Sequence, residues 1–129
     1  MNLKLLVIYS YTSITIMTSN DSQTFEYTRE IISQNKVSLI NGDCLTEMKK
    51  IADNSIDMIL CDLPYGVTKN KWDEVIPFEK LWEQYNRIIK LNGAVVLFGS
   101  QPFTTMLIYS NRKYFRYCLV WEKNKFSDF

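Results

Sequence analysis

The residues best suited to chemistry form one short segment, residues 62–66, which reads Asp-Leu-Pro-Tyr-Gly. It directly follows the apolar run at 56–61, which is typical of a strand buried on both faces. Asp62 supplies a carboxylate at the end of that strand, and Tyr65 supplies a flat aromatic ring. A hydrogen-bond acceptor beside a stacking surface suits the amino group of a nucleobase.

The exocyclic amino nitrogen of adenine or cytosine is a poor nucleophile, because its lone pair is delocalised into the ring. Two acceptors aimed at its hydrogens would return the lone pair to nitrogen. Asp62 can supply one acceptor and the Leu63 carbonyl the other, with Pro64 restricting Leu63 to an extended conformation. Tyr65 could stack on a base taken out of the duplex, a contact worth about 1–3 kcal/mol. The alternative is a tight turn with no chemical role.

The elements that must position this segment alternate between strand and helix patterns. Strands are predicted at 37–41, 56–61, 94–98 and 115–121, and helices at 25–32, 45–51, 78–90 and 103–109. This alternation predicts an α/β fold with a mainly parallel sheet. Ligands bind beyond the carboxyl ends of such strands, so the loops at 42–44, 62–66 and 99–102 should gather on one rim.

Two predicted elements have distinctive side-chain patterns. Apolar residues recur at three- and four-residue steps after Pro77, which predicts that the aromatic stripe of the 78–90 helix is core. The segment at 115–121 alternates instead, which is typical of a half-exposed strand at the sheet margin.

Composition narrows the class of protein. A chain of 129 residues with 47% apolar and 22% charged residues is expected to form one globular domain. The chain has no histidine, which excludes imidazole as a general base or metal ligand. Its three cysteines are widely spaced, so we predict no metal site and no disulfide framework, but reduced thiols in the cytoplasm.

Residues 1–36 are predicted to be an amino-terminal extension. Their longest apolar run is too short for a signal core or a membrane span, so no membrane contact is expected. Net charge is only +1, but basic and aromatic residues mix between 112 and 125. That mixture suits contact with nucleic-acid phosphates and bases, or equally the solvated face of an amphipathic strand.

Several blocks in this sequence resemble amino-group DNA methyltransferases. The segments 41–44, 53–61 and 62–66 are similar to the amino-terminal half of that family. A narrower resemblance, to phage-type adenine-N6 enzymes of restriction-modification type, rests on the segments 70–73, 81–85, 99–103 and 120–125. The resemblance implies a partial Rossmann-like methyltransferase sheet with helices on both faces, incomplete at the carboxyl end. Residues 37–129 would be the amino-terminal part of a DNA methylase N-4/N-6 domain.

The resemblance also implies roles for individual residues. Asp62 and the Leu63 carbonyl would hold the target amino group, Pro64 would stiffen the turn, and Tyr65 would stack on the extruded base of double-stranded DNA. The cofactor, S-adenosylmethionine, would be bound by Asp43, through its adenine amino group, with the Cys44 backbone N–H beside it and Asp62 near its reactive end. Without the resemblance, Asp43 is a helix N-cap.

The resemblance also bears on three residues outside the turn and the cofactor site. Trp121 would lie near the base pocket or in the core of a margin strand, and Lys69 and Lys71 would contact phosphates.

The sequence departs from the family pattern in two places. Leu63 stands where the family usually has the first proline of Asp-Pro-Pro-Tyr, and no Gly-x-Gly occurs for the loop that cradles the methionine end of the cofactor. We therefore predict a truncated enzyme that binds the cofactor weakly and needs a carboxyl-terminal half or a second chain. The alternatives are a catalytically silent DNA-binding remnant, one half of a split enzyme, or a cytosine-N4 methyltransferase.

Overall fold

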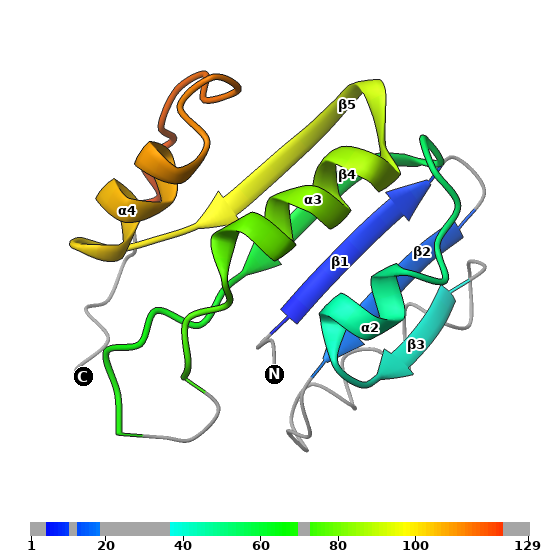
Figure 1. Ribbon diagram of the computed structural model, residues 1–129, viewed down its shortest axis with the longest axis horizontal. Coiled ribbons are helices and arrows are strands. Elements are labelled where there is room, and N and C mark those ends of the chain that lie inside the picture. Colours follow the sequence, from blue (N-terminus) through cyan, green and yellow to red (C-terminus); the bar gives the residue numbers. More distant parts are fainter. Residues whose placement is uncertain (1–4, 11–12, 19–36, 70–72, 123–129) are drawn as a thin grey trace.

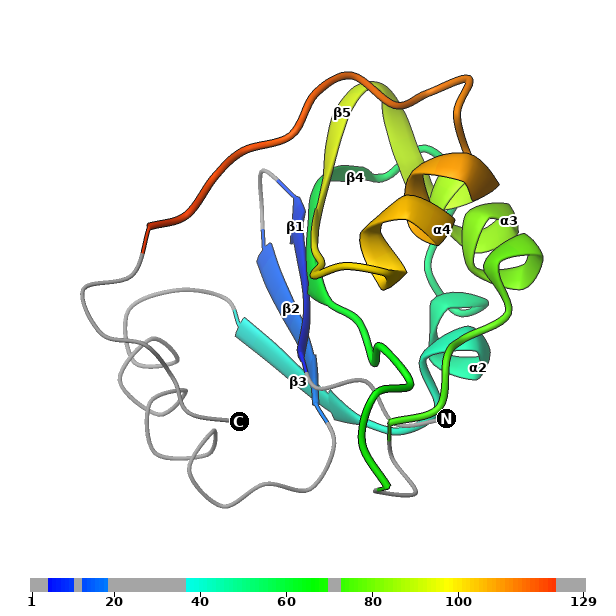
Figure 2. The ribbon, with the colours of Figure 1, turned by 90° about the vertical axis from the view of Figure 1, so that its left-hand side faces the viewer.

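The computed structural model describes residues 5–10, 13–18, 37–69 and 73–122. The elements, in chain order, are β1 (Leu5–Ser10), β2 (Ser13–Thr18), β3 (Val37–Asn41), α2 (Cys44–Met48), β4 (Ile56–Asp62), α3 (Phe78–Ile88), β5 (Ile89–Phe98) and α4 (Phe103–Ser110). The described strands form one sheet, and the three described helices, α2, α3 and α4, lie against the same face of it (Figures 1 and 2). The predicted α/β class is confirmed.

The sheet has the strand order β3-β2-β1-β4-β5. Pairing is parallel between β2 and β3 and between β4 and β5, whereas β1 is antiparallel to both β2 and β4. Four strands therefore run in one direction and β1 runs against them. Only residues 11 and 12 separate β1 from β2, and a connection that short cannot make a parallel crossover.

The described helices lie on one face of the sheet, and the prediction of helices on both faces stays a prediction, because the helix predicted at 25–32 lies outside the described residues. The crossovers from β3 to β4 and from β4 to β5 advance in the same direction across the sheet. Right-handed connections that advance in one direction place their helices on one face. The helices α2 and α3 therefore lie side by side on that face (Figure 2).

The amino-terminal segment contributes β1 and β2 to the middle of the sheet. The division of the chain at residue 36 stays a prediction, but the sheet contains strands from both sides of it. The helix predicted at 25–32 lies outside the described residues.

Most of the predicted elements are present with shifted ends. The helix predicted at 78–90 ends at Ile88, and β5 begins at the next residue, five residues before the predicted strand. Ile89 has an extended backbone, with φ −73° and ψ 138°, and pairs with Ile56 of β4. Pairing with a buried neighbour strand thus replaces the last helical turn.

The strand predicted at 115–121 is wrong, because this segment has no regular secondary structure. Its alternating apolar side chains are largely solvent-exposed, with Tyr117 at 74% and Leu119 at 76%. Trp121 contacts the sheet through Phe98, at 5.7 Å between ring centroids. A strand needs backbone hydrogen bonds to a neighbour, which the side-chain pattern alone does not provide.

The core lies between the sheet and the helices. The apolar stripe of α3 is buried as predicted, with Leu81, Tyr85 and Ile88 fully inaccessible. Arg87, in the last turn of α3, donates to the carbonyl oxygens of Met48 at 2.7 Å and Ile51 at 2.8 Å. These bonds satisfy carbonyl groups at the end of α2 and hold the two helices in register.

Candidate functional site

The candidate site begins where β4 ends. Asp62 is the last residue of β4, an inner strand, and its partners in the sheet are Leu5 of β1 and Phe98 of β5. The carboxylate is partly buried, whereas the side chains of Leu63 and Pro64 are buried in the core. The two apolar residues therefore anchor the turn and leave the carboxylate at its edge. The loops after β3, β4 and β5 leave from the same side of the sheet, which confirms the predicted rim (Figure 1).

Tyr65 contacts Asp62 directly. Its hydroxyl donates to Asp62 Oδ1 at 2.9 Å, and its ring packs on Phe103, with ring centroids 4.9 Å apart and planes inclined by 31°. Burial, and then the hydrogen bond to Asp62, raise the pKa of the Tyr65 hydroxyl above its ordinary value of 10.0. The hydroxyl is therefore a neutral donor at physiological pH.

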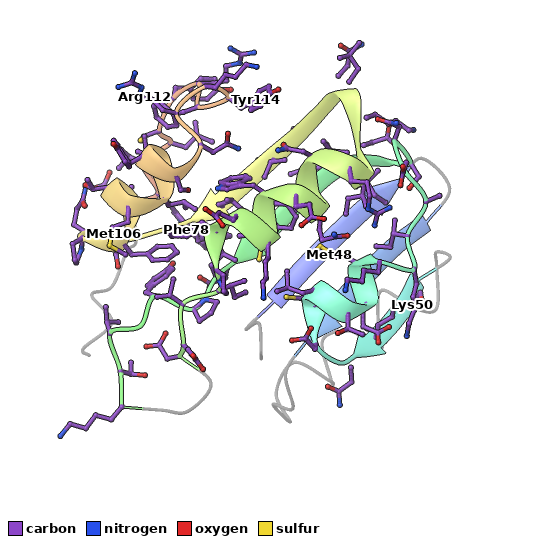
Figure 3. All side chains as sticks on the ribbon, viewed as in Figure 1. Met48, Lys50, Phe78, Met106, Arg112 and Tyr114 are labelled. Atoms are coloured by element: carbon purple, nitrogen blue, oxygen red, sulfur yellow. The ribbon has the colours of Figure 1, made fainter. Side chains whose placement is uncertain are left out.

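Phe103 contacts the Tyr65 ring from the core. It is only 1% exposed at the start of α4 and also contacts Phe78, at 5.8 Å between ring centroids. Figure 3 shows Phe78 at the start of α3. Phe78 and Phe103 both lie in helices predicted from the sequence, but the contact between Phe103 and Tyr65 was not predicted. A Pro-Phe pair at the start of a helix carries no signal for that contact.

The loop after Tyr65 is organised by Asp73, for which the sequence predicted no individual role. Its carboxylate accepts four backbone N–H bonds from consecutive residues: Oδ1 from Tyr65 at 2.8 Å and Gly66 at 3.0 Å, and Oδ2 from Val67 at 2.9 Å and Thr68 at 2.6 Å. Burial opposes ionisation of Asp73, but the bonds from Thr68 and Gly66 outweigh it and lower the pKa from 3.8 to about 2. The carboxylate is therefore charged at neutral pH.

The predicted cofactor residues lie on the same rim, at a distance from this turn. Asp43 caps α2, because its Oδ1 accepts from the Thr46 N–H at 2.9 Å and the Thr46 hydroxyl at 3.0 Å. The Cys44 side chain is fully buried, and burial, followed by the nearby Asp43 charge, raises its pKa to about 11. Only the backbone of Cys44 can therefore face a ligand.

The structure does not bring Asp43 and Asp62 together. Two strands separate β3 from β4, so their carboxyl ends are roughly 14 Å apart at ordinary strand spacing. The Asp43 carboxylate suits the amino group of an adenosine moiety. The chain has only four glycines and no Gly-x-Gly, so the residues present fit one end of S-adenosylmethionine and not the other.

The first half of the basic and aromatic segment lies far from the Asp62–Tyr65 pair, whereas Trp121, in its second half, contacts Phe98, the neighbour of Asp62 in the sheet. Figures 1 and 2 both place the loop after α4 at the opposite end of the structure from the loop after β4. Figure 3 shows Arg112 and Tyr114 at that far end. Lys69 is exposed on the loop after β4, and Lys71 lies outside the described residues. The first half of the basic segment therefore does not extend the site around Tyr65.

Among the described residues, no helix has the length and apolar character needed to span a membrane. Within the same ranges, no cluster of three or more cysteine, aspartate or glutamate side chains is arranged to hold a metal ion.

Comparison with known proteins identifies methyltransferases. The chain is 30% identical to the DNA adenine methyltransferase YhdJ of Escherichia coli over 95 aligned positions, which cover 65% of this chain and 32% of that protein. It is 31% identical to the Type II methyltransferase M.BamHI of Bacillus amyloliquefaciens, covering 58% of this chain and 20% of that protein. It is 29% identical to the Type II methyltransferase M2.DpnII of Streptococcus pneumoniae, covering 57% of this chain and 35% of that protein.

These matches agree with the resemblance found in the sequence: the chain is similar to one DNA adenine methyltransferase and to two Type II methyltransferases. It spans about a third or less of the length of these relatives. No family model matches the chain. No solved structure matches it either.

Proposed function

We propose that this chain is the amino-terminal part of a DNA adenine-N6 methyltransferase with a Rossmann-like sheet. Such an enzyme transfers a methyl group from S-adenosylmethionine to the amino group of a base extruded from double-stranded DNA. The observation that carries this proposal is the partly buried Asp62 carboxylate at the carboxyl end of an inner strand, bonded to Tyr65. Sequence similarity to methyltransferases supports it.

In this proposal the turn holds the base and raises the reactivity of its amino nitrogen. Asp62 and the Leu63 carbonyl each accept a hydrogen bond from the amino group of the base. These two bonds keep the lone pair on the amino nitrogen, where it can attack the methyl group. Leu63 and Pro64 fix the backbone because their side chains are buried. Tyr65 stacks on the extruded base, and Phe103 supports the Tyr65 ring from the core.

The other end of the reaction requires the cofactor, which supplies the methyl group. Asp43 and the Cys44 backbone would hold its adenosine end. The chain lacks a glycine-rich loop for the methionine end, so a carboxyl-terminal segment or a second chain would complete the site.

Transfer of labelled methyl from S-adenosylmethionine to DNA tests the proposal, with the chain alone and with a carboxyl-terminal methyltransferase segment added in trans. We expect incorporation in the presence of the added segment and its loss in Asp62→Ala. Asp57→Asn is the matched control, because Asp57 lies on the same strand at the other end, paired with Lys90 at 2.7 Å. Equal incorporation by wild type and Asp62→Ala would refute the assignment of Asp62.

A further inference from the structure

The loop that follows Tyr65 has little contact with the core. Gly66, Val67, Thr68 and Lys69 are all exposed, and the Val67 side chain is 60% accessible. A loop of this kind is ordinarily mobile, because few buried contacts oppose its opening. The four N–H bonds to Asp73 are therefore the main described interactions that can hold this loop in one conformation.

The backbone of the loop is shaped for a single anion. Gly66 has φ +70°, a left-handed conformation that turns successive N–H groups toward the same side. A side chain at this position would also clash, since a Cβ would lie 2.8 Å from Val75 Cγ2. The Asp73 carboxylate fills the concave side with two bonds to each oxygen.

Asp73 is itself firmly placed. Its residue is 6% exposed, and Ile76, three residues later, is 2% exposed in the core. Tyr65 is thus held at two points. Its hydroxyl, at the tip of the side chain, is bonded to Asp62, and its backbone N–H is bonded to Asp73.

We propose that Asp73 is a positioning residue, which acts through the backbone of Tyr65 to hold the aromatic ring where an extruded base must stack. This inference rests on the proposed function and goes beyond it, because it assigns the precision of the base-holding turn to a residue eight positions away. Asp73 does not touch the base. Losing it changes how well the ring is placed, and misplacement by about 1 Å can reduce a rate by roughly 100-fold.

The test compares the full chain with Asp73→Asn and Glu74→Gln. Asp73→Asn keeps the shape but places an NH₂ group, which cannot accept, against two of the four N–H donors. Glu74→Gln changes the same charge at the exposed neighbouring residue. We expect amide hydrogen exchange at residues 65–68, followed by NMR, to accelerate about tenfold or more in Asp73→Asn and not in Glu74→Gln.

The second readout is base stacking, probed with a DNA duplex that carries one bulged 2-aminopurine. We expect wild type and Glu74→Gln to quench its fluorescence, and Asp73→Asn to quench several-fold less while its DNA affinity by anisotropy stays within about twofold. In a Tyr65→Ala background, Asp73→Asn should have no further effect on quenching, because it acts through Tyr65. A purely stabilising residue would not show this dependence.

The outcomes separate the two proposals. The duplex is offered with the carboxyl-terminal segment of the methyl-transfer test added. If wild type then neither binds nor quenches it, the proposed function fails, and the exchange data still judge whether Asp73 holds the loop. If exchange accelerates but Asp73→Asn quenches like wild type, the positioning role is wrong. If Asp73→Asn does not fold, the same two measurements on Val67→Pro test the positioning role. This variant removes one of the four N–H donors to Asp73, at an exposed residue. We expect a smaller change in the same direction, and unchanged exchange and quenching would overturn the inference.

Discussion

Replacing Tyr65 by phenylalanine should separate the contribution of its hydroxyl from that of its ring. The hydroxyl makes a 2.9 Å bond to Asp62, and the ring keeps its contact with Phe103 in the variant. A hydrogen bond to a charged group contributes about 1.5–3 kcal/mol to the free energy of unfolding. Asp62 is only partly buried, so water can replace the lost donor. We therefore expect the lower end of that range, about 1.5 kcal/mol, at pH 7.

This contribution should disappear at high pH. Because the pKa of Tyr65 is raised in the folded protein, the folded state retains its proton where the unfolded state has lost it. The stabilisation is then fully present below the unfolded pKa of about 10 and declines as pH rises beyond it. The variant lacks this titration, so the difference between wild type and Tyr65→Phe should be constant up to about pH 10 and narrow above it.

Urea unfolding followed by circular dichroism, at several pH values between 7 and 11, measures this difference. Tyr109→Phe is the matched control, because Tyr109 is 80% exposed on α4 and loss of its hydroxyl should change the free energy of unfolding by less than about 0.5 kcal/mol at pH 7. A Tyr65→Phe variant as stable as wild type at pH 7 would refute the hydrogen-bond argument. A difference that persists undiminished at pH 11 would refute the titration argument.

Three further predictions concern the support of the site. Phe103→Ala should lower the free energy of unfolding by about 3–5 kcal/mol in urea titrations, because it leaves a cavity under Tyr65. Gly66→Ala should cost about 2 kcal/mol in the same assay, because of the left-handed backbone and the contact with Val75, whereas Gly42→Ala should stay within about 0.5 kcal/mol. The contribution of the Asp73 carboxylate to the free energy of unfolding should be fully present above pH 4 and lost as the pH falls toward the folded pKa of about 2. The melting temperature of Asp73→Asn should therefore fall less than that of wild type between pH 5 and pH 2.

Each of these has a clear contrary result. A loss below 1 kcal/mol in Phe103→Ala would mean that the ring stack contributes little to the core. Equal costs at Gly66 and Gly42 would contradict the conformational argument, since Gly42 would meet only the flexible Glu47 side chain, at 3.1 Å. Parallel acid melts for wild type and Asp73→Asn would show that the backbone bonds do not stabilise the charged carboxylate.

The local elements of the fold could be predicted because they depend on nearby residues. The spacing of Leu81, Tyr85 and Ile88 defines a buried helix face, and the apolar run before Asp62 defines an inner strand. The common rim followed from the shared direction of β3, β4 and β5. The base-binding and cofactor-binding roles of the rim residues stay predictions.

Long-range pairing could not be predicted in this way. Nothing in the pattern of β1 and β2 indicates that they lie between β3 and β4, because strand order depends on contacts between distant segments. The alternation at 115–121 describes a strand without showing whether a neighbour exists to pair with it. Asp73 was missed for a similar reason, since the loop must curve back before its carboxylate meets the N–H of Tyr65.

The position of β1 makes the whole sheet depend on six residues near the start of the chain. Because β1 alone joins β2 to β4, a polypeptide that began at Met17 would split the sheet into a remnant of β2 with β3 and a separate β4–β5 ribbon. Two-stranded ribbons are barely stable in water, and the cut edge of β4 would present unpaired amides beside Asp62. Shortening this chain from its amino end would therefore disturb the edge of the sheet that carries Asp62.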